Sequence, residues 1–105
     1  MDAKTQARLE ARAQIIKAMA HPTRLFIVEQ LAEGERCVCE LTEMIGSDMS
    51  TVSKHLSLLK SAGIVQDDRR GSQVFYELRV KCVLNFFQCV ESVIQCNVEL
   101  QRDLL

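Results

Sequence analysis

Five cysteines are the side chains of this 105-residue chain with the most distinctive chemistry. Cys37 and Cys39 are separated by one residue, so their side chains share a side of an extended chain but lie on opposite sides of a helix. They can converge on one ion if the chain is extended, or just entering a helix, at Cys37. Two thiolates suit soft ions such as As(III), Cd(II), Pb(II) or Zn(II), and a trigonal or tetrahedral site needs at least one further ligand.

The other three cysteines, Cys82, Cys89 and Cys96, repeat every seven residues and so line one edge of a predicted helix. Neighbours along that edge are about 10 Å apart, which is too far for one ion to bridge them within the helix. Each would meet a ligand from elsewhere, such as a second subunit, undergo thiol oxidation, or fill space as a small apolar side chain. All three interpretations stay open.

The redox state of the compartment determines whether an odd number of cysteines should be interpreted as disulfides or as free thiols. Residues 1–14 are polar and of mixed charge, so they do not resemble a signal peptide, and no apolar run approaches the length of a membrane span. We therefore expect a cytoplasmic protein with no membrane partner. In that reducing context free thiols, metal ligands or redox sensors are favoured over a disulfide framework.

The elements that must position Cys37 and Cys39 are two short helices over residues 40–62. Gly46 suits the end of the first helix, and the second begins near Met49. On a helical wheel the second helix has an apolar side and an opposite polar side. The apolar side contains Val52, Leu56, Leu59 and Gly63, and the polar side contains Ser50, Lys54, Ser57 and Ser61. An exposed face of small hydroxyls and one lysine is typical of a helix that enters a DNA groove.

After Gly63 the periodicity changes from helix to strand. Residues 64–67 and 73–78 are predicted strands, with Arg69 and Arg70 at the hairpin tip between them. Two exposed arginines can form an ordinary solvated loop, but beside a helix-turn-helix they favour a wing that touches phosphate or the minor groove. Residues 49–81 carry six basic and three acidic side chains, although the whole chain has a net charge of −1.

The two ends of the chain are predicted helices, over residues 1–20 and 81–103. The final helix has an apolar arc of roughly 140°, wider than one small domain usually buries by itself. It is therefore a candidate dimer interface together with the N-terminal helix. The predicted fold is mainly α with a small β-hairpin, in one domain that spans residues 1–105. Its helix-turn-helix covers residues 40–62 and its wing covers residues 64–78.

Several motifs carry a resemblance to a known family: Ala20-His21-Pro22-Thr23-Arg24, Cys37-Val38-Cys39-Glu40-Leu41, Ser50-Thr51-Val52-Ser53-Lys54-His55-Leu56, Ala62-Gly63-Ile64-Val65, and Arg69-Arg70-Gly71 through Tyr76-Glu77-Leu78. In this order and spacing the chain closely resembles the ArsR/SmtB family. The resemblance implies a homodimeric winged helix-turn-helix repressor that leaves its operator when a metal, metalloid or oxidant binds. It also implies that Cys37 and Cys39 supply thiolates to the inducer.

The sequence departs from the family pattern in its sulfur ligands. Thr42 stands where arsenite sensors with three clustered cysteines have the third thiol, and the N-terminal cysteines of cadmium and lead sensors are absent. Cys82 and Cys96 occupy positions in the family's second sensing place that His or carboxylate usually fills. These departures concern the identity of the inducer and leave the regulator class unchanged.

We therefore expect a transcriptional repressor that binds double-stranded operator DNA as a homodimer. The expected signal is a soft ion, As(III) or Sb(III) first and then Cd(II), Pb(II) or Zn(II), and no constitutive cofactor is expected. The alternative is a thiol redox or persulfide sensor of the same fold, in which Cys37 or Cys39 pairs with a cysteine of the final helix. A plain dimerisation module is a third hypothesis, and an enzyme is not expected because the βαβ pattern of thiol oxidoreductases is absent. The residues expected to contact DNA are Ser50, Thr51, Ser53, Lys54, His55, Ser57, Arg69 and Arg70. For His55, which lies beside the buried edge of its helix, a packing role is the alternative.

Overall fold

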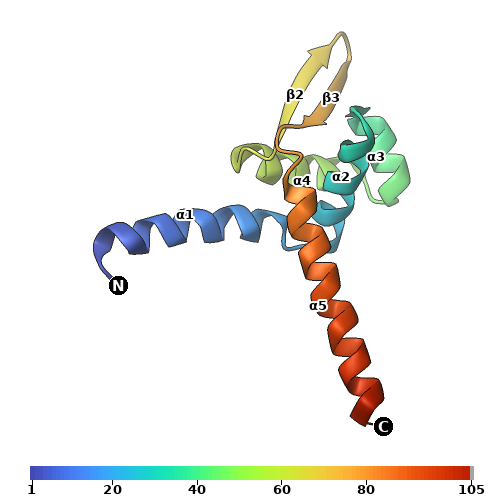
Figure 1. Cartoon of the computed structure of the whole chain (residues 1–105). Coiled ribbons are helices and arrows are strands. Elements are labelled where there is room, and N and C mark those ends of the chain that lie inside the picture. The colour runs from blue at the N-terminus through green and yellow to red at the C-terminus, as the bar shows by residue number, and fades with distance from the viewer. Residues whose placement is uncertain (105) are drawn as a thin grey trace.

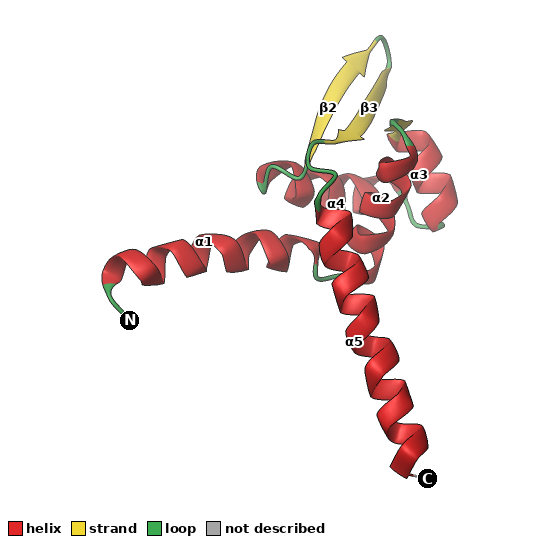
Figure 2. Ribbon diagram, viewed as in Figure 1, coloured by secondary structure: helices red, strands yellow, loops and turns green. Residues whose placement is uncertain are grey.

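Five helices and a three-stranded antiparallel sheet make up residues 1–104, the part of the chain that the computed structural model describes (Figure 2). In chain order the elements are α1 (Ala3–Met19), α2 (Pro22–Glu33), β1 (Arg36–Cys37), α3 (Val38–Ile45), α4 (Met49–Ser61), β2 (Val65–Arg70), β3 (Gln73–Leu78) and α5 (Val83–Leu104). Every predicted helix is present, with its bounds shifted by one to three residues at most ends. The predicted mainly α winged helix-turn-helix fold is confirmed.

The hydrophobic core lies where α2, α3, α4 and the base of the wing meet. From α4, Val52, Leu56 and Leu59 are completely buried, as the helical wheel predicted. They pack in one cluster with Ile27 of α2 and Leu41 of α3. Burial of this apolar side fixes which face of α4 remains outside, and that outer face is the polar one.

The turn between α3 and α4 has the residues that its backbone requires. Gly46 ends α3 in the left-handed conformation, with φ of 80°, and its N–H donates to the carbonyl of Thr42 at 3.0 Å. Asp48 caps α4, since its carboxylate accepts a hydrogen bond of 2.8 Å from the N–H of Thr51. That hydrogen bond holds the pKa of Asp48 below its usual value.

The sheet contains one strand more than the sequence predicted. The two-residue strand β1 pairs antiparallel with β3, with Arg36 opposite Tyr76 and Cys37 opposite Phe75. Strand β2 also continues to Arg70, beyond the predicted end at residue 67, so the hairpin tip is only Gly71-Ser72. Pairing along the whole hairpin makes the wing a stiff ribbon that projects from the helical body (Figure 1).

The helices α1 and α5 extend away from the body (Figure 1). No residue of α5 is buried among those described, although it carries a row of large apolar side chains. The exposed apolar residues of the two helices include Ile15, Ile16, Phe86, Val90, Val93, Ile94 and Val98. An open groove of about 340 Å³ lies between α1, α2 and α5. Among the helices of residues 1–104, none combines the length and apolar character needed to cross a membrane.

Adjacent leucines of α4 give a matched test of this core. Leu59 is 0% exposed, whereas Leu58 is 51% exposed on the same helical turn. Leu59→Ala should lower the free energy of unfolding by about 2–5 kcal/mol, because it leaves a cavity in the core. Leu58→Ala should change it by about 1 kcal/mol or less. Urea denaturation at one fixed protein concentration compares the two, and equal losses would contradict this assignment of the core.

Candidate functional site

The cysteine pair lies at the junction between β1 and α3. Cys37 ends β1 and is the N-cap of α3 in an extended conformation, with φ of −77° and ψ of 161°, while Cys39 lies in the first turn of the helix. This backbone brings the two sulfurs together, and they form a disulfide with Cα atoms 5.4 Å apart. The predicted convergence of Cys37 and Cys39 is confirmed. The expectation of free thiols is corrected for this pair, because the extended N-cap places the two sulfurs within bonding distance.

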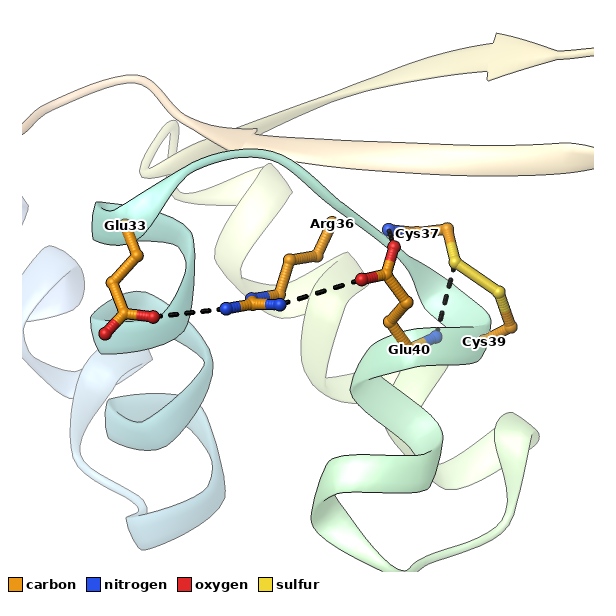
Figure 3. A network of polar contacts seen from close by, with 5 residues as sticks. All are labelled: Glu33, Arg36, Cys37, Cys39 and Glu40. Atoms are coloured by element: carbon orange, nitrogen blue, oxygen red, sulfur yellow. Dashed lines mark hydrogen bonds and ion pairs between the residues drawn. A yellow bond between two sulfur atoms is a disulfide. The ribbon is translucent and has the colours of Figure 1, made fainter.

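A reciprocal capping arrangement holds Cys37 in place (Figure 3). The N–H of Glu40 donates to the Cys37 sulfur at 3.3 Å, and the N–H of Cys37 donates to the Glu40 carboxylate at 3.2 Å. Arg36 bridges Glu33 at 3.1 Å and Glu40 at 3.6 Å. Cys37 is only 3% exposed, whereas Cys39 is exposed. A sulfur at this helix N-terminus is therefore well placed to carry negative charge when it is a thiolate.

The pair does not belong to a preformed cluster of metal-ligating side chains in the described part of the chain. Within residues 1–104 no group of three or more His, Cys, Asp or Glu side chains lies close enough to share a metal. The Thr42 hydroxyl donates to the carbonyl of Val38 at 2.7 Å, so it is already engaged within α3.

The three cysteines of α5 are exposed and unpaired in the described chain. Cys82 precedes the first residue of α5, and Cys89 and Cys96 lie within the helix. The disulfide of Cys37 is formed with Cys39, so the pairing with a final-helix cysteine that the redox hypothesis invoked is not present. Ligand, redox and filler roles for these three thiols stay predictions.

The outer face of α4 presents most of the predicted DNA contacts together. Ser50, Thr51, Lys54 and Ser57 are exposed, and Ser53 is half-buried toward the wing side of the helix. These are hydrogen-bond donors and acceptors of a size that reaches base edges and phosphates. The face is held outward by the buried side of the same helix, so its orientation follows from the core.

His55 differs from its neighbours on α4. It is half-buried, its ring lies 4.6 Å from that of His21, and Arg24 approaches its Nδ1 atom at 3.2 Å. Burial and the neighbouring His21 and Arg24 lower the pKa of His55. A DNA contact by His55 stays a prediction, and the position of the ring fits the packing role better. His21 caps α2 through Nδ1, as expected for a helix boundary.

The two wing arginines have different surroundings. Arg70 makes a bidentate pair with Glu35, at 2.7 and 2.8 Å, and a third contact with Asp68 at 2.9 Å. Its guanidinium also lies 4.5 Å from the centroid of the Phe75 ring. The pair lowers the pKa of Glu35 and raises that of Arg70. Arg69 is exposed, and no ion pair involves it within residues 1–104.

Sequence reasoning missed Glu35 and Arg24 as members of these networks. Glu35 belongs to the connection before β1, 35 residues from Arg70, and nothing in the local pattern links the two. Strand β1 is only two residues long, so it left no alternating pattern to detect.

A helix-turn-helix with an outward polar face, followed by a two-stranded wing, defines a winged helix-turn-helix DNA-binding protein. Comparison with known proteins gives the family. Residues 21–67 match the pattern of the bacterial regulatory protein, arsR family. The chain belongs to the ArsR family. The family and the relatives found by the comparison are transcriptional regulators and not enzymes.

Three relatives illustrate the similarity. The HTH-type transcriptional repressor SmtB of Mycobacterium tuberculosis is 43% identical over 70 residues, which cover 67% of this chain and 52% of that protein. The arsenic resistance transcriptional regulator ArsR1 of Pseudomonas putida is 35% identical, covering 81% and 67% of the two chains. The homodimeric winged helix-turn-helix domain Mb0332 of Mycobacterium bovis superposes with a TM-score of 0.78 at 32% identity, covering 94% and 92%. The chain thus spans about half the length of the SmtB relative.

The surroundings of the wing arginines predict unequal effects on DNA binding. Arg69→Gln should weaken binding and reduce the salt dependence by roughly one phosphate contact. Arg70→Gln should weaken it less, because Glu35 and Asp68 already neutralise Arg70. Glu35→Gln should strengthen binding by freeing Arg70. Fluorescence anisotropy with a labelled duplex from the chain's own promoter, at several salt concentrations, measures all three. A larger loss in Arg70→Gln than in Arg69→Gln would refute this picture of the wing.

The half-buried His55 predicts a pH dependence of stability. Its pKa is lowered from the ordinary value of 6.5 in the folded chain, so below about pH 6.5 the unfolded chain binds the proton more readily. Stability should therefore fall as the pH drops below about 6.5 and should be restored above it. His55→Gln keeps an acceptor for Arg24 but cannot titrate, so its melting temperature should vary less between pH 7 and pH 5. An unchanged pH dependence in this variant would argue against the assignment.

Proposed function

We propose that this chain is a transcriptional repressor that binds operator DNA as a homodimer and is released by a soft ion. The ion, with arsenite preferred, binds the thiolates of Cys37 and Cys39 in the reduced protein. The observation that carries the proposal is the position of the two sulfurs, which meet at the N-terminus of α3, two and four residues before the buried core residue Leu41.

The DNA half of the proposal rests on the outer face of α4 and on the wing. In a two-fold symmetric dimer the two copies of α4 would enter successive major grooves, and the two wings would lie over the flanking backbone. The uncovered apolar side chains of α1 and α5 supply a surface for the second copy, since monomeric proteins rarely expose so continuous an apolar row. The homodimeric state of the Mb0332 domain supports this arrangement.

The sensor half rests on sulfur chemistry at the α3 N-terminus. Once reduced, Cys37 and Cys39 are two soft donors on one side of the chain, and the N–H of Glu40 stabilises charge on the Cys37 sulfur. The relative ArsR1 is named for arsenic resistance, which supports arsenite as the preferred signal.

Release would follow from the attachment of Cys37 to two DNA-binding elements. Drawing both thiolates onto one ion would change the first turn of α3, which leads through the Gly46 turn into α4. It would also pull on β1, whose Cys37 pairs with Phe75 of the wing. Either movement would alter the spacing of the recognition helices across the dimer, so operator and inducer would each weaken the other's binding.

A thiol redox sensor is the second candidate, and one observation favours it: Cys37 and Cys39 are joined by a disulfide. Hydrogen peroxide would accept two electrons from the two thiols, its O–O bond would break, and two waters would leave as the S–S bond forms. A small-molecule persulfide would transfer its outer sulfur to one thiol and leave as a thiol. The second cysteine would then attack the inner sulfur, which forms the same disulfide and releases hydrogen sulfide. Cys39 is exposed to such an oxidant. Formation of the disulfide would change the position of the nearby wing and so its contact with DNA.

Cysteine variants of the full chain test the proposal. Arsenite should release the reduced protein from its promoter duplex, and Cys37→Ser/Cys39→Ser should require at least tenfold more arsenite while binding DNA normally. The matched control, Cys82→Ser/Cys89→Ser/Cys96→Ser, should respond as the unaltered chain does. Fluorescence anisotropy follows release in both.

The same assay separates the two candidates. Release by arsenite from the Cys37→Ser/Cys39→Ser variant would disprove the proposed ion site. Release by hydrogen peroxide without any response to arsenite, reversed by dithiothreitol, would replace the soft-ion sensor by the redox sensor. Absence of DNA binding by the reduced, ion-free chain would contradict the repressor itself.

A further inference from the structure

A small cavity beside the cysteine pair contains one more sulfur. The cavity, of about 200 Å³, lies between the start of α3, the start of α4 and the tip of the wing. Its polar and sulfur-containing lining consists of Cys37, Cys39, Met49, Ser53, Ser72 and Gln73. The cavity is thus lined by both cysteines, by the start of α4 and by the wing, which are the elements of the proposed DNA-binding surface.

Met49 is an unusual residue for its position. It is the first residue of α4, directly after the Asp48 cap, and its side chain is 54% exposed. An apolar side chain there has little core contact to explain it. Its thioether sulfur is a soft donor, whereas the hydroxyls of Ser53 and Ser72 in the same cavity are hard ones.

We propose that Met49 supplies the third ligand to a soft ion held by Cys37 and Cys39, in a trigonal sulfur site that joins α3 to α4. This inference rests on the proposed ion site and completes its ligand set. The competing positions within the described chain are engaged: the Thr42 hydroxyl donates to the carbonyl of Val38. The nearby Glu40 carboxylate accepts from the N–H of Cys37 and pairs with Arg36.

The ligand set also defines a class of ion. Two thiolates and a neutral thioether form a soft donor set of the kind that selects Cu(I). We therefore expect the site to take Cu(I), and its redox-stable analogue Ag(I), in addition to arsenite. Only the monovalent ions should depend strongly on the thioether, because it adds a soft donor without adding charge.

A ligand from Met49 would couple the ion directly to the recognition helix. The next two residues, Ser50 and Thr51, are exposed members of the predicted DNA-contacting face. An ion that draws Met49 toward Cys37 and Cys39 would pull the first turn of α4 toward α3 and the wing tip. Release would then begin within one subunit, before any change in the spacing between the two subunits.

Another interpretation of Met49 can be tested together with this one. Exposed apolar side chains on a recognition helix also contact thymine methyl groups in the major groove. Met49→Leu preserves the apolar volume and so such a contact, but removes the sulfur. Met44→Leu is the matched control, because Met44 lies on α3, is 42% exposed, and does not line the cavity.

The experiment uses the reduced full chain under nitrogen in chloride-free buffer, with Ag(I) as the probe. The chain has four methionines, so ¹³C labelling of their ε-methyl groups gives four NMR signals that the leucine variants assign. At one equivalent of Ag(I) the Met49 signal should shift and the Met44 signal should not. By competition with a chelator, Met49→Leu should bind Ag(I) at least tenfold more weakly than Met44→Leu.

The outcomes distinguish this inference from the function on which it rests. If Cys37→Ser/Cys39→Ser binds Ag(I) as tightly as the unaltered chain, the thiolate site itself is wrong. If binding needs the two thiols but Met49→Leu matches Met44→Leu, the site stands and Met49 is not its third ligand. Unchanged Ag(I) affinity in Met49→Leu, together with weakened DNA binding by ion-free Met49→Ala but not by Met49→Leu, would assign Met49 to the groove and overturn the inference.

Discussion

Cys37 pairs through its backbone with Phe75 of the wing and caps α3 through its sulfur, and both interactions require the same extended conformation. A helical Cys37 would direct its sulfur away from Cys39 and would also lose the ladder to β3. The capping bonds with Glu40 keep the residue in the extended state. One backbone conformation therefore fixes the sulfur pair, the start of the helix-turn-helix and the base of the wing.

The wing is tied to the same segment by a second, electrostatic contact. Glu35 lies two residues before Cys37 and holds Arg70 from the opposite strand of the sheet, while Phe75 lies beneath the guanidinium. Exposed ion pairs usually contribute little to folding stability, so this contact is better understood as one that orients the wing. The same contact neutralises Arg70, one of the two arginines at the end of β2. Arg69 is the other, and it is the one proposed to contact phosphate.

Local patterns predicted the parts of this molecule whose signals lie within one element. The buried side of α4, the Gly46 turn and the hairpin all follow from periodicity and turn chemistry, and Val52, Leu56 and Leu59 lie where those patterns placed them. The convergence of Cys37 and Cys39 followed on the condition that Cys37 is extended, because it depends only on the backbone conformation of this short segment. The contact of Glu35 with Arg70 and that of Arg24 with His55 did not follow, since both depend on elements that meet only in the folded chain. The cavity that contains Met49 belongs to the same class, as three separate elements line it.

The unburied helix α5 places a constraint on how the chain can act. This 22-residue helix has no buried side chain, and of its described residues only Val83 and Phe87 pack partly against the core of a single copy. Most helical stability in proteins comes from packing of the apolar face, so a single copy leaves most of that stabilisation of α5 unused. Its row of Phe86, Val90 and Ile94 continues into the groove beside α1 and α2, so one second copy could cover the helix and the groove together. Helix α2 lines the groove of the proposed dimer surface and also contacts α4 through Arg24 and His55. It therefore connects the proposed dimer surface to the recognition helix. A change in the first turn of α3 or α4 would then shift the side chains packed between these helices and α2, and so would alter the proposed dimer surface. That route explains how a site on one subunit could alter the fit of both recognition helices to a two-fold symmetric operator.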